Sequence, residues 1–343
     1  MTAPADGPAR GLSAWPIEGI GEITPGTDLG ALLVEVLGAG LEDGDVVLVT
    51  SKVVSKAEGR VRTGSRESAV DDETVRVVAR RGPTKIVENH LGLVMAAAGV
   101  DASNTEPGTV VLLPSDPDAT ARALRTRLHD ETGRNVGVVV TDTTGRAWRA
   151  GQTDLAVGTA GIEPLDDHAG RTDSYGNELA VTAPAIVDEL ASTAELVTGK
   201  LGARPVSVVR GVADRVLPVG EHGSGAHSLV RPRSQDMFAL GAREAVLAAV
   251  RGVDADCFGS AAPLEEVLAA LVSCGLPSEA TGASIRVPLP DGERDRVAGV
   301  ERVRLVAHAH GWRPQSDLTV SDSVTISPTG PPRGSRSPAS ERP

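Results

Sequence analysis

The chain has 343 residues, a formal net charge of −12 and an aromatic content of only 2%. Its length predicts two domains, since a domain commonly takes about 100–200 residues. The acidic balance argues against a nucleic-acid backbone as partner, because proteins that bind one need a basic face. Scarce aromatic side chains also argue against single-strand binding by base stacking. A small anionic ligand held by local lysines, backbone N–H groups and a cation remains compatible with this composition.

The sequence lacks the signals of a membrane or secreted protein. It contains no run of about 18 apolar residues, which argues against a membrane span, and its first residues lack the apolar core of a signal peptide. Cys257 and Cys274 form neither a CxxC pair nor a disulfide framework. A reducing compartment is therefore expected, and we predict a cytoplasmic protein.

Apolar runs and helical patterns alternate loosely along the first 210 residues. Clusters of β-branched residues predict strands at 45–50, 109–113, 135–141 and 205–210. Helical spacing with flanking Gly or Pro predicts helices at 72–81, 117–132 and 184–200. The apolar segment 92–99 fits either a strand or a helix. This order predicts an α/β or α+β fold with a mixed sheet, not a doubly wound parallel sheet.

The texture of the sequence changes after Leu240. Short helices are expected at 243–251 and 263–276, and strands at 284–289 and 302–308. The end of the chain is rich in Pro, Gly, Ser and Arg, which is typical of disorder. The expected organisation is a disordered leader at 1–14, a main region at 15–240, a small appended unit of unassigned role at 241–325, and a disordered tail at 326–343.

Several familiar motifs fail when tested against the sequence. Gly199-Lys200 resembles the end of a P-loop, but Ala194 stands where glycine is needed and Leu201 where Ser or Thr is needed. The seven histidines show no HExxH spacing, and no GxSxG segment is present.

Three other segments place polar side chains directly after apolar runs. Segment 50–59 (TSKVVSKAEG) brings hydroxyls together with two lysines, which are groups suited to phosphate. Segments 98–104 (AGVDASN) and 140–146 (VTDTTGR) each contribute an aspartate. Two carboxylates and a hydroxyl are a ligand set for a hard divalent cation. Each segment alone is more often a solvated strand end, a helix cap or a turn, and only their combination favours a site for metal and phosphate.

A fourth segment, 220–226 (GEHGSGA), is rich in glycine. Its backbone N–H groups would be able to approach a phosphate closely. A flexible loop explains the same composition.

Four strings in this chain resemble, in the same order, the coenzyme F420-0:gamma-glutamyl ligases. They are TSKVVSKAEGR, ENHLGLVMAAAGVDASN, VVVTDTTGRAWRAGQTDLAVGTAGI and GSGAHSLVRP. The resemblance runs from about Trp15 to Leu240 and is closest to the amino-terminal ligase domain of the actinobacterial bifunctional enzyme. It implies a two-domain, mixed-sheet ligase fold that forms an intertwined homodimer.

The resemblance also implies a reaction. GTP would phosphorylate a carboxylate of F420-0, and the amine of L-glutamate would attack the acyl phosphate, releasing GDP and phosphate. The implied cofactors are GTP as co-substrate, Mg²⁺ or Mn²⁺, and K⁺. Such chemistry requires a cation beside the transferred phosphoryl group and a site that excludes water from the acyl phosphate.

Roles follow from the resemblance position by position. The catalytic residues would be Asp101, Asp142 and Lys56. The metal ligands would be Asp101, Asp142, Thr143 and Glu221. The nucleotide contacts would be Ile20, Gly21, Glu22, Ile23, Ser51, Lys56, Asn104, Gly223, Ser224, Gly225 and Ala226. Charge alone suggests Arg146 and Arg149 for the phosphate of F420-0 or the carboxylates of glutamate.

Two other functions stay open at this point. One is a GTP-dependent amide ligase that acts on another carboxylate; the other is a non-catalytic protein that binds nucleotide or deazaflavin. A decayed enzyme would be expected to lose its metal-binding aspartates, and Asp101 and Asp142 are both present. The bifunctional enzyme that this chain resembles continues, after its ligase domain, into a flavin-binding, nitroreductase-like domain. The roughly 100 residues after Leu240 are too few for such a domain, so a flavin-dependent activity is not expected.

Overall fold

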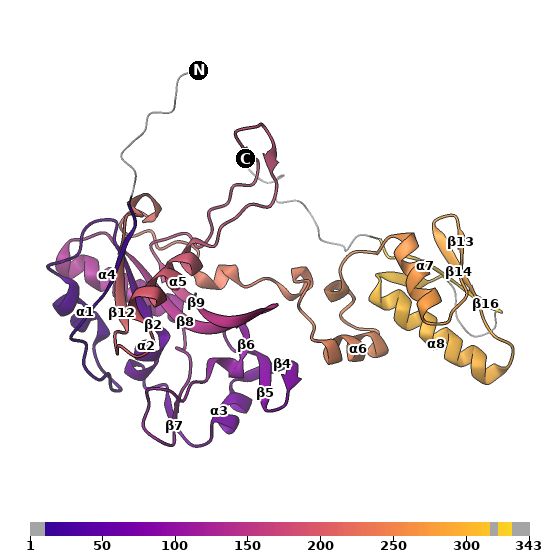
Figure 1. Ribbon diagram of the computed structural model, residues 1–343, viewed down its shortest axis with the longest axis horizontal. Helices are drawn as coiled ribbons and strands as arrows, with labels where there is room; N and C mark the ends of the chain where they lie inside the picture. Colours follow the sequence, from indigo (N-terminus) through magenta and orange to yellow (C-terminus); the bar gives the residue numbers. More distant parts are fainter. Residues whose placement is uncertain (1–10, 316–321, 331–343) are drawn as a thin grey trace. The chain divides into compact units, whose positions relative to one another are not determined.

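A computed structural model describes residues 11–315 and 322–330 of the chain. It divides into two compact units, Met1–Val230 and Arg231–Pro343, which are drawn in Figure 1. The division falls at Val230, before the boundary expected at Leu240. Each unit has a hydrophobic core of its own.

A five-stranded mixed sheet forms the centre of the first unit. Its strands, in spatial order, are β1 (Ser13–Pro16), β12 (Val206–Arg210), β2 (Val46–Thr50), β8 (Gly137–Arg146) and β9 (Arg149–Ala160). Strands β2 and β8 run parallel, and the other neighbouring pairs are antiparallel. The α/β fold with a mixed sheet predicted from the sequence is therefore confirmed.

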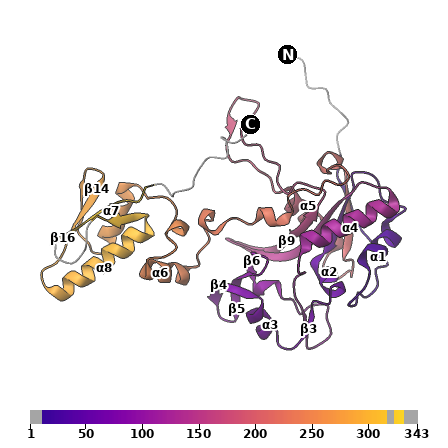
Figure 2. The ribbon, with the colours of Figure 1, turned by 180° about the vertical axis from the view of Figure 1, so that it is seen from behind.

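Helices cover both faces of this sheet. Side chains alternate across a strand, so Val47 and Val49 pack into the core under α1 (Leu29–Leu37) and α4 (Pro117–Thr132). Val46 and Leu48 face the opposite side, where α5 (Ile186–Thr198) packs. The two views in Figures 1 and 2 show this arrangement of helices on either side of the strands. The short helix α2 (Ser51–Ala57) follows β2 directly and begins at the edge of the sheet.

A smaller substructure lies between β2 and α4 in the chain. It contains β3 (Val61–Thr63), α3 (Arg66–Asp72), β4 (Thr74–Arg81), β5 (Thr84–Asn89), β6 (Val94–Ala96) and β7 (Thr109–Val111). β3 pairs with β7, and β4, β5 and β6 form an antiparallel sheet. Val70, Val87 and Val110 are part of its separate core. A two-stranded ladder of β10 (Arg171–Thr172) and β11 (Glu178–Leu179) lies between β9 and α5 in the chain.

The second unit is a small α/β structure. Its helices are α6 (Ala242–Arg251), α7 (Leu264–Ser273) and α8 (Glu293–Ala309). Its antiparallel sheet has the order β13 (Glu279–Thr281), β14 (Ser284–Pro288), β16 (Ser323–Pro328) and β15 (Trp312–Pro314). Leu271, Ile285, Val303 and Ile326 are fully buried in the core between the helices and the sheet.

Most elements predicted from the sequence are confirmed. The helix predicted at 117–132 matches α4 at both ends. The strands predicted at 45–50, 109–113, 135–141, 205–210 and 284–289 correspond to β2, β7, β8, β12 and β14. The helices predicted at 184–200, 243–251 and 263–276 correspond to α5, α6 and α7. The ambiguous segment 92–99 contains β6 followed by a turn of 3-10 helix, Ala97–Gly99.

Two predicted elements are wrong. The segment 72–81 is mostly the strand β4, because Gly82 and Pro83 form the turn of a hairpin that pairs it with β5. The segment 302–308 is part of helix α8, which begins at Glu293, and its buried residues Val303 and Ala307 lie four positions apart on one helix face. In both places the secondary structure is set by packing against a distant segment of the chain, which a short sequence pattern does not reveal.

The ends of the chain also differ from the expected division. Residues 1–10 and 331–343 lie outside the described part. Ser13 and Ala14, placed in the leader from sequence, pair with β12 as part of β1. Ile326, placed in the tail, is fully buried in β16. Within residues 11–315 and 322–330, no helix is long and apolar enough to cross a bilayer.

Candidate functional site

A cleft of about 1210 Å³ lies in the first unit, where the parallel strands β2 and β8 end. The carboxyl ends of parallel strands meet at one edge of a sheet, which is the usual place for a ligand site in such folds. Most of the rest of its lining comes from residues 20–23, helix α2, the loop at 99–106, strand β9, and the end of α5 with the residues that follow it. Most of the residues predicted from sequence converge here.

A hydrogen bond joins α2 to β8 where Asp142 lines the cleft, and its donor, Ser51, lies buried behind the lining. Ser51 Oγ donates to Asp142 Oδ1 at 2.7 Å. Ser51 is buried at the start of α2, and Asp142 follows the buried part of β8. The bond fixes one oxygen of the carboxylate, while Oδ2 makes no hydrogen bond within the described part of the chain. That oxygen is left for a ligand.

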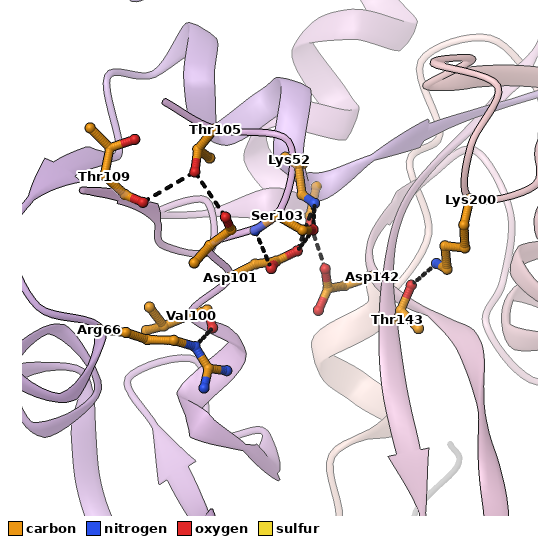
Figure 3. A network of polar contacts seen from close by, with 12 residues as sticks. Lys52, Arg66, Val100, Asp101, Ser103, Thr105, Thr109, Asp142, Thr143 and Lys200 are labelled. Atoms are coloured by element: carbon orange, nitrogen blue, oxygen red, sulfur yellow. Dashed lines mark hydrogen bonds and ion pairs between the residues drawn. The ribbon is translucent and has the colours of Figure 1, made fainter. Parts of the chain in front are cut away.

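A second cluster surrounds Asp101. Lys52 Nζ lies 2.6 Å from Asp101 Oδ2 and donates to Ser103 Oγ at 2.8 Å. The backbone N–H of Ser103 donates to Asp101 Oδ1, and its hydroxyl donates to Oδ2, both at 2.8 Å. Figure 3 shows Lys52 lying above the two aspartates, Asp101 and Asp142, which come from different parts of the chain. The loop thus presents a carboxylate whose orientation is set by three donors.

The backbone before Asp101 is held in an unusual conformation. Ala97, Ala98 and Gly99 all have positive φ, a region that costs free energy for alanine. A Cβ atom on Gly99 would lie 2.6 Å from the Leu113 side chain. This close packing against Leu113, just after β7, explains the glycine and fixes the direction in which the loop enters the cleft.

The two aspartates have opposite pKa shifts. Burial raises the pKa of Asp142 to about 6, opposed by the Ser51 hydrogen bond and reinforced by the nearby charges of Asp154 and Asp101. Burial also acts to raise the pKa of Asp101, but hydrogen bonds from Lys52 and Ser103 outweigh it, so its pKa lies below the usual value. Asp101 is therefore ionised at neutral pH, whereas Asp142 becomes fully ionised only near neutral pH or beside a cation.

A third cluster continues along the strand pair β8–β9. Thr143 Oγ1 donates to Asp154 Oδ1 at 2.6 Å. Lys200, just after α5, is hydrogen-bonded to the same threonine oxygen, and Figure 3 shows it reaching Thr143 from the other side of the cleft. Lys200 also forms ion pairs with Asp154 at 3.6 Å and Glu195 at 3.1 Å.

The predicted nucleotide contacts around the amino-terminal loop also lie at the cleft. The lining residues include Ile20, Gly21, Glu22 and Ile23. Lys56 Nζ lies 2.5 Å from Glu22 Oε1, and both residues line the cleft. Asn104 also lines the cleft, in a left-handed conformation that asparagine tolerates.

One cation of the cleft has no carboxylate partner. Arg66, the first residue of α3, donates from Nε to the carbonyl oxygen of Val100 at 3.0 Å. Among the residues that the structure describes, Arg66 forms no ion pair, and Figure 3 shows the other two guanidinium nitrogens pointing away from Val100. These donors suit the carboxylate or phosphate of a ligand.

The donor set fits a hard divalent cation that shares its coordination with substrate. Asp101, Asp142 and Thr143 all line the cleft, and the two carboxylates are close enough for the charge of Asp101 to raise the pKa of Asp142. No group of three His, Cys, Asp or Glu side chains suited to a metal occurs in residues 11–315 or 322–330. Mg²⁺ commonly takes one or two carboxylates and completes its shell with water and phosphate oxygens, so this set is sufficient.

The structure places Glu221 and the loop Gly223 to Ala226 away from this cleft. The carbonyl of His222 accepts the N–H of Gly161 just after β9, beside the paired residues Val138 and Ala160. Four steps of about 3.4 Å along the strand separate Val138 from Asp142, roughly 14 Å. Within one chain these residues do not join the other predicted ligands, and their roles stay predictions.

The glycine-rich loop has structural partners at its own end of the sheet. The backbone N–H of Ala226 donates to Asp118 Oδ1 at 2.8 Å, and Ser224 Oγ donates to Glu163 Oε2 at 2.9 Å. Arg146 and Arg149, suggested from charge, lie exposed near the tip of the β8–β9 hairpin and are not among the residues lining the cleft.

Several cleft residues were not identified as site residues from the sequence. They are Arg66, Asp154 and Lys200, together with the role of Lys52 in pairing with Asp101. A signal for Asp154 did exist, because a hairpin turn at 146–149 places it opposite Thr143 on β9. Lys200 and Arg66 depend on how α5 and α3 pack, which no local pattern records.

Comparison with known proteins decides the family. The family model for F420-0:Gamma-glutamyl ligase matches residues 19–211, which include almost all residues lining the cleft. The chain belongs to this family. The resemblance seen in the sequence is therefore confirmed.

Individual members of the family give the same result. A coenzyme F420:L-glutamate ligase from Methanopyrus kandleri is 40% identical over 238 residues, covering 63% of this chain and 93% of the relative. The Archaeoglobus fulgidus protein of the same name is 38% identical over 222 residues, covering 59% and 88%. A third, from Methanothermobacter thermautotrophicus, is 34% identical over 254 residues, covering 66% and 99%. The unit Arg231–Pro343 lies outside the family match.

Proposed function

We propose that this protein is a GTP-dependent ligase that adds L-glutamate to coenzyme F420-0 through an acyl phosphate. The observation that carries the proposal is the convergence of Asp101, Asp142 and Thr143 with three lysines at one cleft, in a chain of the F420-0:gamma-glutamyl ligase family. Curated relatives that match over most of their length are named coenzyme F420:L-glutamate ligase. The same name supports F420-0 and glutamate as the substrates.

The side chains divide into three tasks in this proposal. Asp101, Asp142 and Thr143 would hold Mg²⁺ or Mn²⁺, which would neutralise charge on the transferred phosphoryl group. Lys56, Ser51, Asn104 and residues 20–23 would hold GTP. Lys56 is half-buried against Glu22, so its ammonium is positioned before a phosphate arrives, which lowers the cost of ordering it.

The reaction then proceeds by displacement at phosphorus and at carbon. A carboxylate oxygen of F420-0 attacks the γ-phosphorus, the bond from phosphorus to the β-γ bridging oxygen breaks, and GDP leaves. The amine of glutamate attacks the acyl carbon, loses a proton, and phosphate leaves with its electron pair. Exclusion of water matters here because water competes with the amine for the acyl phosphate.

A second copy of the chain is the source we propose for Glu221 and the loop Gly223 to Ala226. In one chain they lie at the far end of β8 and β9 from Asp142. Glu221 is exposed there, so a second subunit would be able to present it to a neighbouring cleft. Mixed dimers of Asp142→Asn and Glu221→Ala chains would then recover activity that neither variant has alone. Failure of mixed dimers to gain activity would reject a shared site.

The proposed function is tested by incubating the purified protein with F420-0, glutamate, GTP and Mg²⁺ or Mn²⁺, with and without K⁺. Mass spectrometry of the deazaflavin should show a gain of one or more glutamyl residues that requires both GTP and metal. Replacing GTP by ATP, and F420-0 by other carboxylates, tests each specificity separately. Amide formation only on another carboxylate would support the alternative ligase, and GTP binding without turnover would support a non-catalytic role.

A further inference from the structure

Asp154 is a buried carboxylate at the wall of the cleft. It lies on β9 directly opposite Thr143 of β8, and its side chain is only 8% exposed. Thr143 Oγ1 donates to Asp154 Oδ1 at 2.6 Å, and Thr141 Oγ1 lies 3.3 Å from Oδ2. An ionised carboxylate only accepts hydrogen bonds, so the hydroxyl proton of Thr143 points towards Asp154.

This bond decides what Thr143 can offer to a ligand. A hydroxyl has one proton and two acceptor lone pairs. With its proton committed to Asp154, the oxygen of Thr143 is purely an acceptor on its other side. Lys200 occupies that side, since its ammonium donates to Thr143 Oγ1 and pairs with Asp154 at 3.6 Å. The lone pairs of Thr143 Oγ1 therefore face a positive charge, which is the arrangement that a metal ligand requires.

We propose that Asp154 is a positioning residue that orients Thr143 Oγ1 towards a divalent cation and holds Lys200 at the same oxygen as an exchangeable ammonium. The inference rests on the proposed function for the identity of the metal and substrates. A divalent cation and an ammonium repel each other, so both do not occupy one threonine oxygen. Cation binding therefore turns Lys200 towards the cleft, where it meets an anionic group of a substrate.

A purely structural role for the Asp154 side chain is a poorer explanation. The fold is tied at this position by the backbone, because Ser192 Oγ donates to the carbonyl oxygen of Asp154 at 3.1 Å and interacts with Thr153 Oγ1 at 2.8 Å. Those contacts hold β9 against α5 whatever side chain stands at 154. Among the described residues, the hydrogen-bond and ion-pair partners of the carboxylate are threonines 141 and 143 and Lys200, all of which line the cleft.

The test is a double-mutant cycle read out as Mn²⁺ affinity of the full-length protein without nucleotide. Asp154→Asn and Thr143→Val should each weaken Mn²⁺ binding about tenfold or more, the range seen when groups that orient metal ligands are changed. Because Asp154 acts through Thr143, the double variant should bind Mn²⁺ no more weakly than Thr143→Val alone. Asp188→Asn is the matched control, since Asp188 accepts the N–H of Ala156 on the same strand without lining the cleft.

Two results would overturn the assignment. Unchanged Mn²⁺ affinity in Asp154→Asn would remove any role for Asp154 at the cation site. A double variant weakened by the product of the two single effects would make Asp154 an independent ligand instead of a positioning residue. Circular dichroism of each variant identifies any that fails to fold, and Thr143→Ser, which keeps the hydroxyl, should retain most of the wild-type affinity.

Lys200→Met gives an independent test, because it should weaken the binding of an anionic substrate without weakening the binding of Mn²⁺. Removing the ammonium should leave Mn²⁺ affinity unchanged or several-fold higher, while the KM for one anionic substrate rises about tenfold. Weaker Mn²⁺ binding in this variant would contradict the exchange. The Mn²⁺ measurements need no turnover, so they separate this inference from the proposed function. If the effects of Asp154→Asn and Thr143→Val on Mn²⁺ affinity are coupled but the ligase assay fails, only the proposed substrates are rejected. If the enzyme is active but the two effects are not coupled, only the positioning role is rejected.

Discussion

Ser51 and Asp142, 91 residues apart in the sequence, are joined by a hydrogen bond of 2.7 Å from the serine hydroxyl to Oδ1 of the carboxylate. The bond connects the first residue of α2 to the strand β8 that runs parallel to β2. It leaves the second carboxylate oxygen available for a ligand. The site is thus assembled by the parallel pairing of two strands whose ends bear complementary groups.

Removing this bond should loosen the cation site without unfolding the protein. In Ser51→Ala the carboxylate of Asp142 loses the hydrogen bond that favours its charged form and fixes its orientation. We expect Mn²⁺ affinity to fall about tenfold, as for other groups that orient a metal ligand. Isothermal titration with Mn²⁺ measures the effect. Ser55→Ala, in the same helix but without a hydrogen bond to Asp142, is the control, and equal losses in the two variants would contradict the explanation.

Neutralising Asp142 should abolish turnover and stabilise the metal-free protein. The pKa of Asp142 is raised to about 6 in the folded state from its ordinary value of 3.8. The folded form binds the proton more tightly, so this group's favourable contribution is present below the unfolded pKa and is lost as pH rises through about 6. Asp142→Asn should therefore unfold with a free energy higher by on the order of 1–3 kcal/mol at pH 7.5 in EDTA. A lower midpoint temperature than wild type would contradict this reasoning.

The same shift predicts how metal binding depends on pH. Mn²⁺ must displace the proton of Asp142, so its affinity should fall about tenfold per pH unit below about 6. Asp101 does not set the limit, because hydrogen bonds from Lys52 and Ser103 outweigh its burial and keep its pKa low. Titration of Mn²⁺ between pH 5 and 8, followed by electron paramagnetic resonance, measures the profile. A flat profile across this range would show that Asp142 is not a ligand.

Arg66 should determine affinity for an anionic substrate. Its guanidinium faces the cleft without a carboxylate partner in the described part of the chain. Arg66→Gln is expected to raise the KM for either glutamate or F420-0 about tenfold, with kcat changed much less, since the contact is made in the ground state as well as the transition state. Steady-state kinetics with each substrate varied in turn identifies which one. Arg62→Gln, which breaks a surface pair with Asp72, is the matched control and should change neither KM.

The sequence predicted those parts of the site that lie at the ends of apolar runs. Asp101, Asp142 and Thr143 follow such runs, and all three line the cleft. Asp154 was missed because it lies within β9, where only the register with β8 reveals that it faces Thr143. Lys200 follows the end of α5, and its position depends on the packing of that helix, which is set by non-local contacts.

The errors in the fold have a similar origin. Val75 and Val77 lie on either side of Arg76 in β4, as expected of a strand. The alternation is short and follows helix α3 directly, so the same residues also fit a helical spacing. In α8 the strand expected at 302–308 reflects a local density of β-branched residues, whereas the buried positions Gly299, Val303 and Ala307 recur every four residues. Glu221 shows a further limit, since a sequence match assigns it to a site that one chain alone does not assemble.

The most direct test of the central claim follows oxygen atoms through the reaction. F420-0 labelled with ¹⁸O in its carboxylates is incubated with GTP, glutamate and Mg²⁺, and the released phosphate is analysed by mass spectrometry. Phosphorylation of the carboxylate predicts one ¹⁸O atom in each phosphate for every glutamyl bond formed, because the acyl carbon–oxygen bond breaks when the amine attacks. Phosphate without ¹⁸O, released alongside glutamylated product, would contradict the acyl-phosphate mechanism. Absence of glutamylated product with the folded, metal-loaded protein would contradict the ligase itself.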